Sequence, residues 1–201
     1  MAEIVLLRHS KTYGNTMGRY IGSRTDEPLC REGRELLEGR FYPDVSRIYV
    51  SPMKRCVETA RLIWPEMSGR MIPVSDLREC DFGDFENKSY RELNGNPDYQ
   101  AWIDSGGTLP FPNGESMEGF KKRCRRGFAQ IVREAAGMET GAGEKMPVRI
   151  AVVAHGGTIM SILERYGFPQ RPYFDYQVKN GRGYLLTPVE GTELWNCQYL
   201  P

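Results

Sequence analysis

Two histidines are the side chains of this 201-residue chain whose type and position favour catalysis. His9 follows the apolar run 3–8, and His155 follows the run 148–154. Continuous apolar runs of this length are typical of buried parallel strands. A lone histidine at a strand end is more often a structural residue, but chance less readily explains why both histidines of the chain share this position. Because a neutral imidazole is a competent nucleophile toward phosphorus, the pair points to phosphoryl chemistry.

The residues around His9 could supply the donors that a phosphoryl group needs. Arg8, Ser10, Thr12 and Asn15 all lie within six residues of the histidine. A transferring phosphoryl group requires several fixed donors around its equatorial oxygens. The guanidinium of Arg8 and the amide of Asn15 are donors of this kind, so we predict a phosphate site just beyond the first strand.

Three apolar runs, at 3–8, 47–50 and 148–154, must form the strands that position these side chains. Each run is followed by polar residues and then by a helical pattern, and Ser51-Pro52 resembles a helix start with proline at its first position. In open α/β sheets, ligands bind at the carboxyl ends of the strands. We therefore predict a three-layer α/β/α sandwich around a mostly parallel sheet, in which His9, residues 51–55 and His155 converge on one pocket.

The rest of the chain is expected to complete a single domain over residues 1–201. Residues 76–118 mix acidic, aromatic and turn-forming residues, which predicts a small helical and loop cap insertion. A long helix is predicted from Glu115 to Ala136, followed by a flexible surface loop at 137–145. Residues 170–201, with predicted strands at 183–187 and 193–199, are interpreted as sheet-edge and packing elements rather than parts of the site.

Charge and cysteine content exclude several functional classes. The formal net charge is +1, so no long-range field favours nucleic acid or an anionic membrane as a partner. Five widely spaced cysteines without a C-x-x-C pair indicate reduced, buried thiols, and we expect a cytoplasmic protein. The two histidines leave no ligand set for a metal, so no metal or other cofactor is expected. The oligomeric state cannot be read from the sequence.

Several motifs resemble those of one known family. Arg8-His9-x-x-Thr12-x-x-Asn15 resembles the R-H-G-x-T-x-x-N signature of the histidine phosphatase (phosphoglycerate mutase-like) superfamily. Further matches follow in the family's order and cover most of residues 4–160. They are Gly22-x-x-x-Asp26-x-Pro28-Leu29-x-x-x-Gly33, Ser51-Pro52-x-x-Arg55-x-x-x-Thr59-Ala60, Leu77-Arg78-Glu79 with Phe82-Gly83, Gly114-Glu115-Ser116, and Ala154-His155-Gly156-Gly157.

The resemblance implies a metal-independent phosphomonoesterase that works through a phosphohistidine. His9 would attack phosphorus, and Glu79 would protonate the leaving group and later activate water. The resemblance also implies that Arg8, Arg55, Asn15 and His155 hold the phosphoryl oxygens. Further phosphate or substrate contacts are expected from Thr12, Ser10, Gly156, Tyr20 and Gly22.

Some assignments stay open at the level of the sequence. Spacing alone does not separate Glu79 from Asp81, Asp84 or Glu86 as the acid; the resemblance selects Glu79. Because two arginines would lower the pKa of this acid, we expect burial or the substrate's charge to keep it protonated. Ser51 is either a helix N-cap or a phosphate contact.

One position departs from the family's signature. The glycine that follows its nucleophilic histidine is replaced by Ser10. If the backbone there required a positive φ, the serine would cost about 1 kcal/mol of strain.

The run 78–86 (RECDFGDFE) is similar to the R-E-x-D-F-G-D-[WF]-E pattern of the bacterial α-ribazole phosphatase-type branch. This favours hydrolysis of a small phosphorylated metabolite, such as α-ribazole 5′-phosphate or a sugar phosphate. The alternatives are a phosphoglycerate mutase, which the short, arginine-poor cap disfavours, and an inactive phosphate-binding protein on the same fold. Aromatic residues are expected to line the cap, among them Tyr13, Tyr20, Phe82, Phe85 and Trp102.

Overall fold

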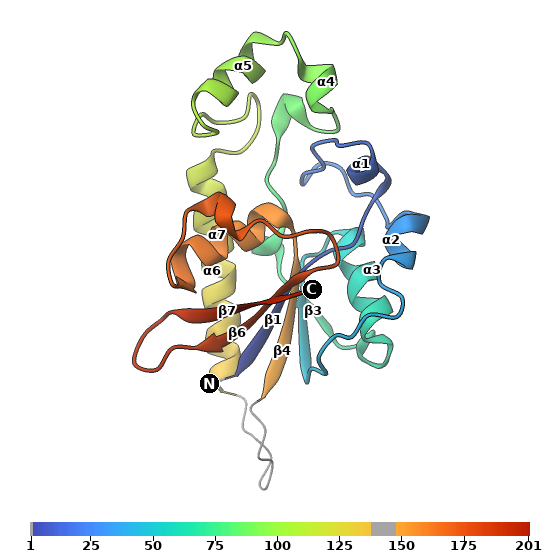
Figure 1. Ribbon diagram of the computed structural model, residues 1–201, viewed down its shortest axis with the longest axis vertical. Helices are drawn as coiled ribbons and strands as arrows, with labels where there is room; N and C mark the ends of the chain where they lie inside the picture. Colours follow the sequence, from blue (N-terminus) through green and yellow to red (C-terminus); the bar gives the residue numbers. More distant parts are fainter. Residues whose placement is uncertain (1, 138–147) are drawn as a thin grey trace, which may run out of the picture.

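The fold is built on one mixed, mostly parallel sheet (Figure 1). A computed structural model describes residues 2–137 and 148–201. In that part of the chain the strand order is β3-β2-β4-β1-β6-β7-β5. The strands are β1 (Glu3–Arg8), β2 (Arg47–Val50), β3 (Met71–Pro73), β4 (Arg149–Ala154), β5 (Gly167–Phe168), β6 (Gly183–Pro188) and β7 (Trp195–Leu200).

The register of the three central strands brings the two histidines together. β1 and β4 pair in parallel, and Arg8 lies opposite Ala154 at their carboxyl ends. β2 pairs in parallel with β4 on the other side, with Val50 opposite Val153. The residues that follow these three strands are His9, Ser51 and His155, so the two histidines lie side by side at the carboxyl edge of the sheet. The predicted convergence therefore follows from the strand register.

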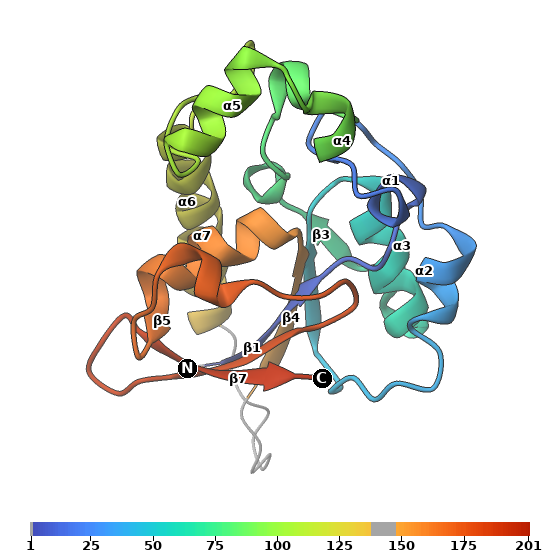
Figure 2. The same cartoon turned by 45° about the horizontal axis from the view of Figure 1, so that its top comes forward.

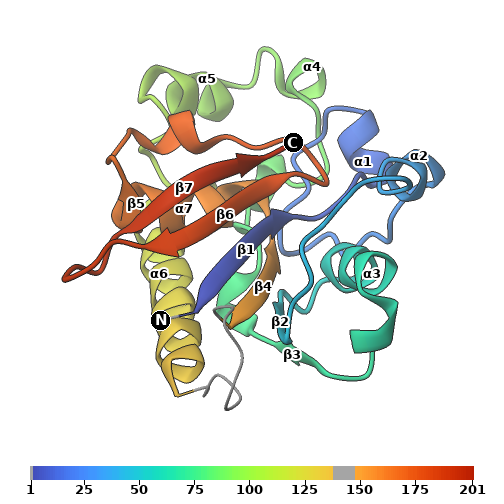
Figure 3. The same cartoon turned by 60° about the horizontal axis from the view of Figure 1, so that its bottom comes forward.

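Alternating side chains of β1 pack against two different helical layers. Val5 and Leu7 belong to an apolar cluster with Cys56 and Ala60 of helix α3 (Lys54–Ile63). Ile4 and Leu6 point the other way, into the larger cluster that α6 (Met117–Ala136) and α7 (Gly156–Tyr166) cover. Because both faces are covered, the strand is continuously apolar rather than alternating. The three-layer α/β/α arrangement predicted from the sequence is confirmed, and Figure 3 shows helices on both sides of the sheet.

Capping residues set where the helices begin. The long helix α6 starts at Met117 because the Ser116 hydroxyl accepts a hydrogen bond from the Gly119 N–H. α3 begins at Lys54 with Met53 as its N-cap, so the prediction of a helix start at Ser51-Pro52 was wrong. Short helices α1 (Tyr13–Thr16) and α2 (Arg31–Glu35) follow β1.

The predicted cap lies beyond the carboxyl ends of the central strands (Figures 1 and 2). It contains α4 (Tyr90–Leu93), α5 (Pro97–Asp104) and 3-10 turns at Ser75–Leu77 and Gly83–Phe85. Aromatic rings hold it together in edge-to-face and stacked pairs, which stabilise such clusters beyond simple burial. The rings belong to Tyr20, Phe82, Phe85, Tyr99, Trp102 and Phe111.

Three other expectations need correction or lie outside the described residues. Neither of the two predicted edge strands is an edge element, because β6 pairs with β1 and β7, and β7 pairs with β6 and β5. All five cysteines are free thiols, but Cys30 and Cys197 are only partly buried. The flexible loop expected at 137–145 falls, beyond Gly137, outside the described residues. No helix in the part of the chain that the structure describes is long and apolar enough to cross a membrane.

Candidate active site

His9 is held with one ring nitrogen engaged and the other available. Its ring is buried, and Nδ1 lies 2.6 Å from the backbone oxygen of Ser10. A carbonyl can only accept, so Nδ1 carries the proton and Nε2 keeps its lone pair. Burial lowers the pKa of His9 well below its usual value, and the nearby Arg55 and Arg8 lower it further. The imidazole is therefore neutral and nucleophilic at Nε2.

His155 faces His9 across the site, with ring centroids 5.1 Å apart. Its Nδ1 accepts a hydrogen bond from Nε of Arg55 at 3.2 Å, which leaves Nε2 as the protonated nitrogen. Nε2 then donates to the hydroxyl of Ser51 at 2.8 Å. Ser51 is therefore not a helix N-cap, and its hydroxyl is engaged by a hydrogen bond from His155. Burial, with the charge of Arg55, lowers the pKa of His155 well below its usual value.

Two guanidinium groups flank the histidines, that of the buried Arg55 and that of the partly buried Arg8. Arg55, on the first turn of α3, is fully buried and donates to the carbonyl oxygens of Thr25 (2.8 Å) and Gly22 (2.9 Å). Arg8 donates from Nη1 to Val178 at 2.7 Å, and its Nε is buried without a protein partner. A buried unpaired donor is costly unless a ligand accepts from it. These two cations can therefore hold an oxyanion between them.

Glu79 supplies a buried carboxyl group to the same site. Its two oxygens accept hydrogen bonds from the backbone N–H groups of Cys80 (3.0 Å) and Gly157 (3.1 Å). Burial raises the pKa of Glu79 above its usual value, although these hydrogen bonds and the charges of Arg55 and Arg8 act in the opposite direction. A carboxyl group with a raised pKa is suited to donating a proton.

The other three acids of this segment are engaged elsewhere. Asp81 pairs with Arg24, and Asp84 accepts from the side chain of Asn113. Glu86 accepts from the backbone N–H groups of residues 22, 24 and 25 and therefore shapes the loop that Arg55 contacts. Of the four candidates that spacing left open, the structure brings Glu79 alone to the N-terminus of α7, next to His155.

Thr12, Asn15 and Ser10 occupy the turn after His9. Thr12 caps α1, and the side-chain oxygen of Asn15 accepts from the Thr12 N–H at 3.2 Å, which orients the amide. The Ser10 hydroxyl donates to the carbonyl oxygen of Gly33 at 2.5 Å, so its proton is directed to Gly33 and not into the site. Ser10 is not among the residues with positive φ, so the strain considered for this serine does not arise.

The remaining predicted binding residues are placed less directly. Tyr20 shares a hydrogen bond with Tyr99 inside the aromatic cap. The Gly22 carbonyl oxygen accepts a hydrogen bond from Arg55. Gly156 lies against Arg8: a β-carbon on Gly156 would be 3.5 Å from the guanidinium carbon of Arg8. Of the aromatic residues expected to line the cap, Phe85 is buried within it and Tyr13 is 66% exposed.

Comparison with known protein families identifies the family of this chain. The family model of the histidine phosphatase superfamily (branch 1) matches residues 4–198. The chain belongs to this superfamily.

Individual relatives carry both phosphatase and mutase names. Phosphoglycerate mutase-like protein 4 of Arabidopsis thaliana is 31% identical over 82% of this chain and 70% of its own length. The adenosylcobalamin/alpha-ribazole phosphatase of Escherichia coli is 28% identical over 88% of this chain and 85% of its own. The crystal structure of the alpha-ribazole phosphatase from Shigella flexneri matches with a TM-score of 0.81, at 22% identity, over 98% of this chain and 95% of that one.

Sequence reasoning missed part of the site of this superfamily member. We interpreted residues after 170 as packing elements, but Asn180 donates to the backbone oxygen of His9 (3.1 Å) and to the Asn15 side chain (3.4 Å). The loop 177–182 thus lies directly against His9. The Asn180-Gly181 pair before a predicted strand was the available signal, because such pairs mark turns and Gly181 has a φ of +69°.

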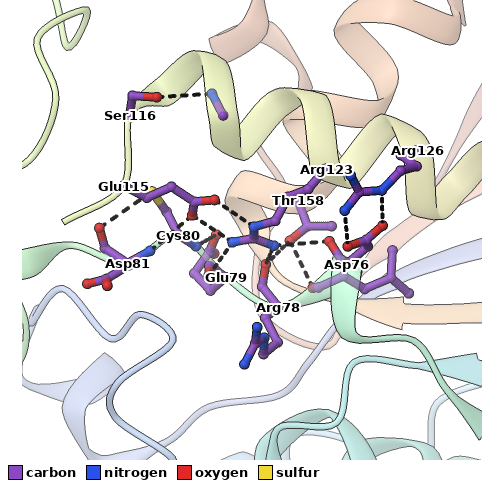
Figure 4. A network of polar contacts seen from close by, with 12 residues as sticks. Asp76, Arg78, Glu79, Cys80, Asp81, Glu115, Ser116, Arg123, Arg126 and Thr158 are labelled. Atoms are coloured by element: carbon purple, nitrogen blue, oxygen red, sulfur yellow. Dashed lines mark hydrogen bonds and ion pairs between the residues drawn. The ribbon is translucent and has the colours of Figure 1, made fainter.

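Arg123 of α6 clamps the loop that carries Glu79 (Figure 4). Its guanidinium donates to the carbonyl oxygens of Asp76 (3.0 Å), Arg78 (2.6 Å) and Glu79 (2.9 Å). The same group forms a two-pronged ion pair with Glu115, at 2.7 and 2.8 Å. Both side chains are mostly buried, so the pair fixes the loop by geometry that a lysine cannot reproduce.

We expect Arg123→Lys to reduce kcat about 10-fold to 100-fold on alkyl phosphates, because small displacements of a catalytic group are costly. Because we expect Glu79 to protonate the leaving group, the loss should be smaller with p-nitrophenyl phosphate, whose leaving group needs less protonation. Arg126→Lys is the matched control, because Arg126 lies on the same helix but is 66% exposed and, among the described residues, forms its ion pair with Asp76 alone. Equal losses with both esters, or equal losses in both variants, would contradict a positioning role for Arg123.

Proposed function

We propose that this superfamily member hydrolyses a small phosphomonoester through a phosphohistidine on His9. The observation that carries the proposal is the pairing of two groups at one site. His9 is neutral with a free Nε2, and Glu79 is a buried carboxyl group whose pKa burial raises. A nucleophile and an acid in those protonation states are what the first half-reaction requires.

In the first half-reaction, Nε2 of His9 attacks phosphorus as the bond from phosphorus to the ester oxygen breaks. The leaving alkoxide takes the proton of Glu79. Arg8 and Arg55 hold the phosphoryl oxygens and stabilise their charge in the loose transition state, together with Asn15 and His155.

In the second half-reaction, the Glu79 carboxylate removes a proton from water. The resulting hydroxide attacks phosphorus, the bond from phosphorus to His9 Nε2 breaks, and inorganic phosphate leaves. Glu79 is then protonated again, so one residue serves both half-reactions with proton balance.

The proposed substrate is a small metabolite such as α-ribazole 5′-phosphate or a sugar phosphate. The name of the Escherichia coli relative and the aromatic cap support this class, since aromatic rings stack on planar or apolar parts of a ligand. A phosphoglycerate mutase is the second candidate, favoured by the name of the Arabidopsis relative. Against it stands the cap, whose central helix α5 carries no arginine or lysine to bind a second charged group.

The proposed reaction uses no metal. In residues 2–137 and 148–201, no group of three or more potential ligands is placed to hold a metal ion. We expect hydrolysis of p-nitrophenyl phosphate and of a panel of phosphomonoesters to persist in EDTA. Phosphate release should be followed alongside transfer of phosphate between carbons of phosphoglycerate. Transfer without release would favour the mutase, loss of activity only on chelation would overturn the mechanism, and no reaction at all would favour an inactive binding protein.

A further inference from the structure

The side chain of Asn180 joins two groups of the active site through one amide nitrogen. Its Nδ2 donates to the backbone oxygen of His9 at 3.1 Å and to Oδ1 of Asn15 at 3.4 Å. Because a backbone carbonyl can only accept, the atom of Asn180 that faces His9 is the nitrogen. The same nitrogen faces Asn15, so Asn15 must present its oxygen to Asn180.

A second backbone group fixes the Asn15 amide in the same orientation. The N–H of Thr12 donates to Oδ1 of Asn15 at 3.2 Å, and a backbone N–H cannot accept. Oδ1 of Asn15 thus receives two donors, which engage both of its lone pairs. Within the described residues, no side-chain hydrogen bond of Asn15 uses Nδ2. Nδ2 is therefore the atom of this amide that can donate to a ligand.

The segment that carries Asn180 is held in place on both sides of this residue. The backbone oxygen of Val178 accepts from Nη1 of Arg8 at 2.7 Å. The N–H of Gly181 donates to the backbone oxygen of Arg8 at 3.2 Å, and the oxygen of Gly181 accepts from the hydroxyl of Tyr42 at 2.9 Å. Because the backbone is fixed before and after Asn180, its amide has a defined position in the site.

We propose that Asn180 is a positioning residue, which holds Oδ1 of Asn15 so that Nδ2 of Asn15 faces the phosphoryl oxygens. The inference rests on the proposed phosphatase function, in which Asn15 is one of the groups that hold these oxygens. If the Asn15 amide turned over, it would present an oxygen to phosphate, and two acceptors that face each other repel. Donors that are oriented in advance stabilise a transition state without reorganisation. Asn180 therefore acts on the phosphoryl group through Asn15.

Two substitutions separate the loss of the Asn180 donor from its replacement by an acceptor. Asn180→Ala removes the hydrogen bond to Asn15, and we expect kcat/KM to fall about 3-fold to 10-fold. Asn180→Asp keeps the size of the side chain but places a carboxylate against the oxygens of His9 and Asn15, so the fall should be about 30-fold or more. Because Asn15 would contact the phosphoryl group and not the leaving group, alkyl phosphates and p-nitrophenyl phosphate should lose equally. This distinguishes Asn180 from Arg123, whose replacement should affect the two esters unequally.

A double-mutant cycle with Asn15→Ala tests whether Asn180 acts through Asn15. The probe is inorganic phosphate, and its affinity is measured by calorimetry, so the test does not depend on turnover. Asn180→Ala should weaken phosphate binding about 3-fold to 10-fold in the wild-type protein, but less than about 2-fold in the Asn15→Ala protein. The loss caused by Asn180→Asp should be at least about 3-fold smaller in the Asn15→Ala protein, the rest being repulsion between the added charge and phosphate.

The matched control is Asn196→Ala, since Asn196 is an exposed asparagine on β7 and should change neither kcat/KM nor phosphate affinity. The proposal is overturned if the effects of Asn180→Ala and Asn15→Ala on phosphate binding add, if Asn180→Ala leaves this affinity unchanged, or if the two esters lose unequally. If Asn180→Asp does not fold, the cycle with Asn180→Ala decides alone. Coupling in phosphate binding without hydrolysis of any ester would count against the proposed reaction and would still support the role of Asn180.

Discussion

His9→Ala is expected to abolish turnover of p-nitrophenyl phosphate, lowering kcat by more than about 10⁴-fold. The variant removes the atom that would form the covalent intermediate, and no water in its place has comparable nucleophilicity. Rapid quenching of the wild-type enzyme under alkaline conditions, followed by phosphorus NMR, should reveal a phosphohistidine that the variant lacks. Activity retained in the variant, or a label on another residue, would contradict the assignment of His9.

The control for His9→Ala is ligand binding. Arg8, Arg55 and Asn15 remain in place, so the variant should still bind inorganic phosphate within about 10-fold of the wild-type affinity. The pH dependence gives a second check on His9. Because burial lowers the pKa of His9, its imidazole stays neutral at pH values where an ordinary histidine becomes protonated. The wild-type kcat/KM should therefore not decline near the pKa of an ordinary histidine on account of this residue.

The part of the fold that carries the histidines was predictable because local pattern and burial agree there. The β1 and β2 segments were predicted at Glu3–Arg8 and Arg47–Val50, and the structure has the same bounds. Both are continuous apolar runs that end in charge or in a turn, which buried parallel strands require. β4, predicted at 148–154 and found at Arg149–Ala154, pairs in parallel with both, so His9 and His155 lie at one edge of the sheet.

Other elements were beyond sequence reasoning for physical reasons. β3 (Met71–Pro73) is only three residues long and partly exposed, so its strand character comes from pairing with β2 and not from its own pattern. β5 has two residues and depends in the same way on β7. Long-range pairing decides such segments, and the sequence around them carries no matching periodicity.

The site shows the same division between local and distant determinants. Glu79 could be chosen from four nearby acids only through the family resemblance, because its selection depends on burial and on the Gly157 N–H, 78 residues away in the chain. The contact of Ser10 with Gly33 and that of Asn180 with His9 also join distant segments. Sequence spacing identifies the residue types for the chemistry, whereas tertiary packing decides which of them meet.

Glu79→Gln is expected to lower kcat on alkyl phosphates by about 10²-fold to 10⁴-fold, the usual contribution of a general acid. Glutamine keeps the size of the side chain, and its one carbonyl oxygen can still accept from the N–H of either Cys80 or Gly157, but it cannot deliver a proton. With p-nitrophenyl phosphate the first half-reaction needs little protonation, so the second half-reaction should become limiting. A burst of p-nitrophenol and an accumulated phosphohistidine, both measurable by rapid mixing, should follow.

The pH dependence of kcat/KM tests whether the protonated form of Glu79 is the active one. Burial raises the pKa of Glu79, and its protonated form is the one that assists the leaving group. The wild-type kcat/KM for alkyl esters should thus fall as the pH rises through this raised pKa, and the fall should be absent in Glu79→Gln. Asp81→Asn is the matched control, since Asp81 lies two residues away and pairs with Arg24.

Stability offers an independent check on the same substitution. A carboxyl group whose pKa is raised in the folded state opposes folding increasingly as the pH rises from its ordinary pKa to the raised one. Glu79→Gln removes this opposition but leaves one of the two backbone N–H groups without its acceptor. The variant should therefore be less stable than the wild type at acidic pH, and the difference should shrink or reverse as the pH rises. An alkaline fall in kcat/KM that persists in Glu79→Gln but disappears in Asp81→Asn would transfer the acid role to Asp81. A stability difference between the wild type and Glu79→Gln that does not change with pH would mean that Glu79 does not titrate with a raised pKa.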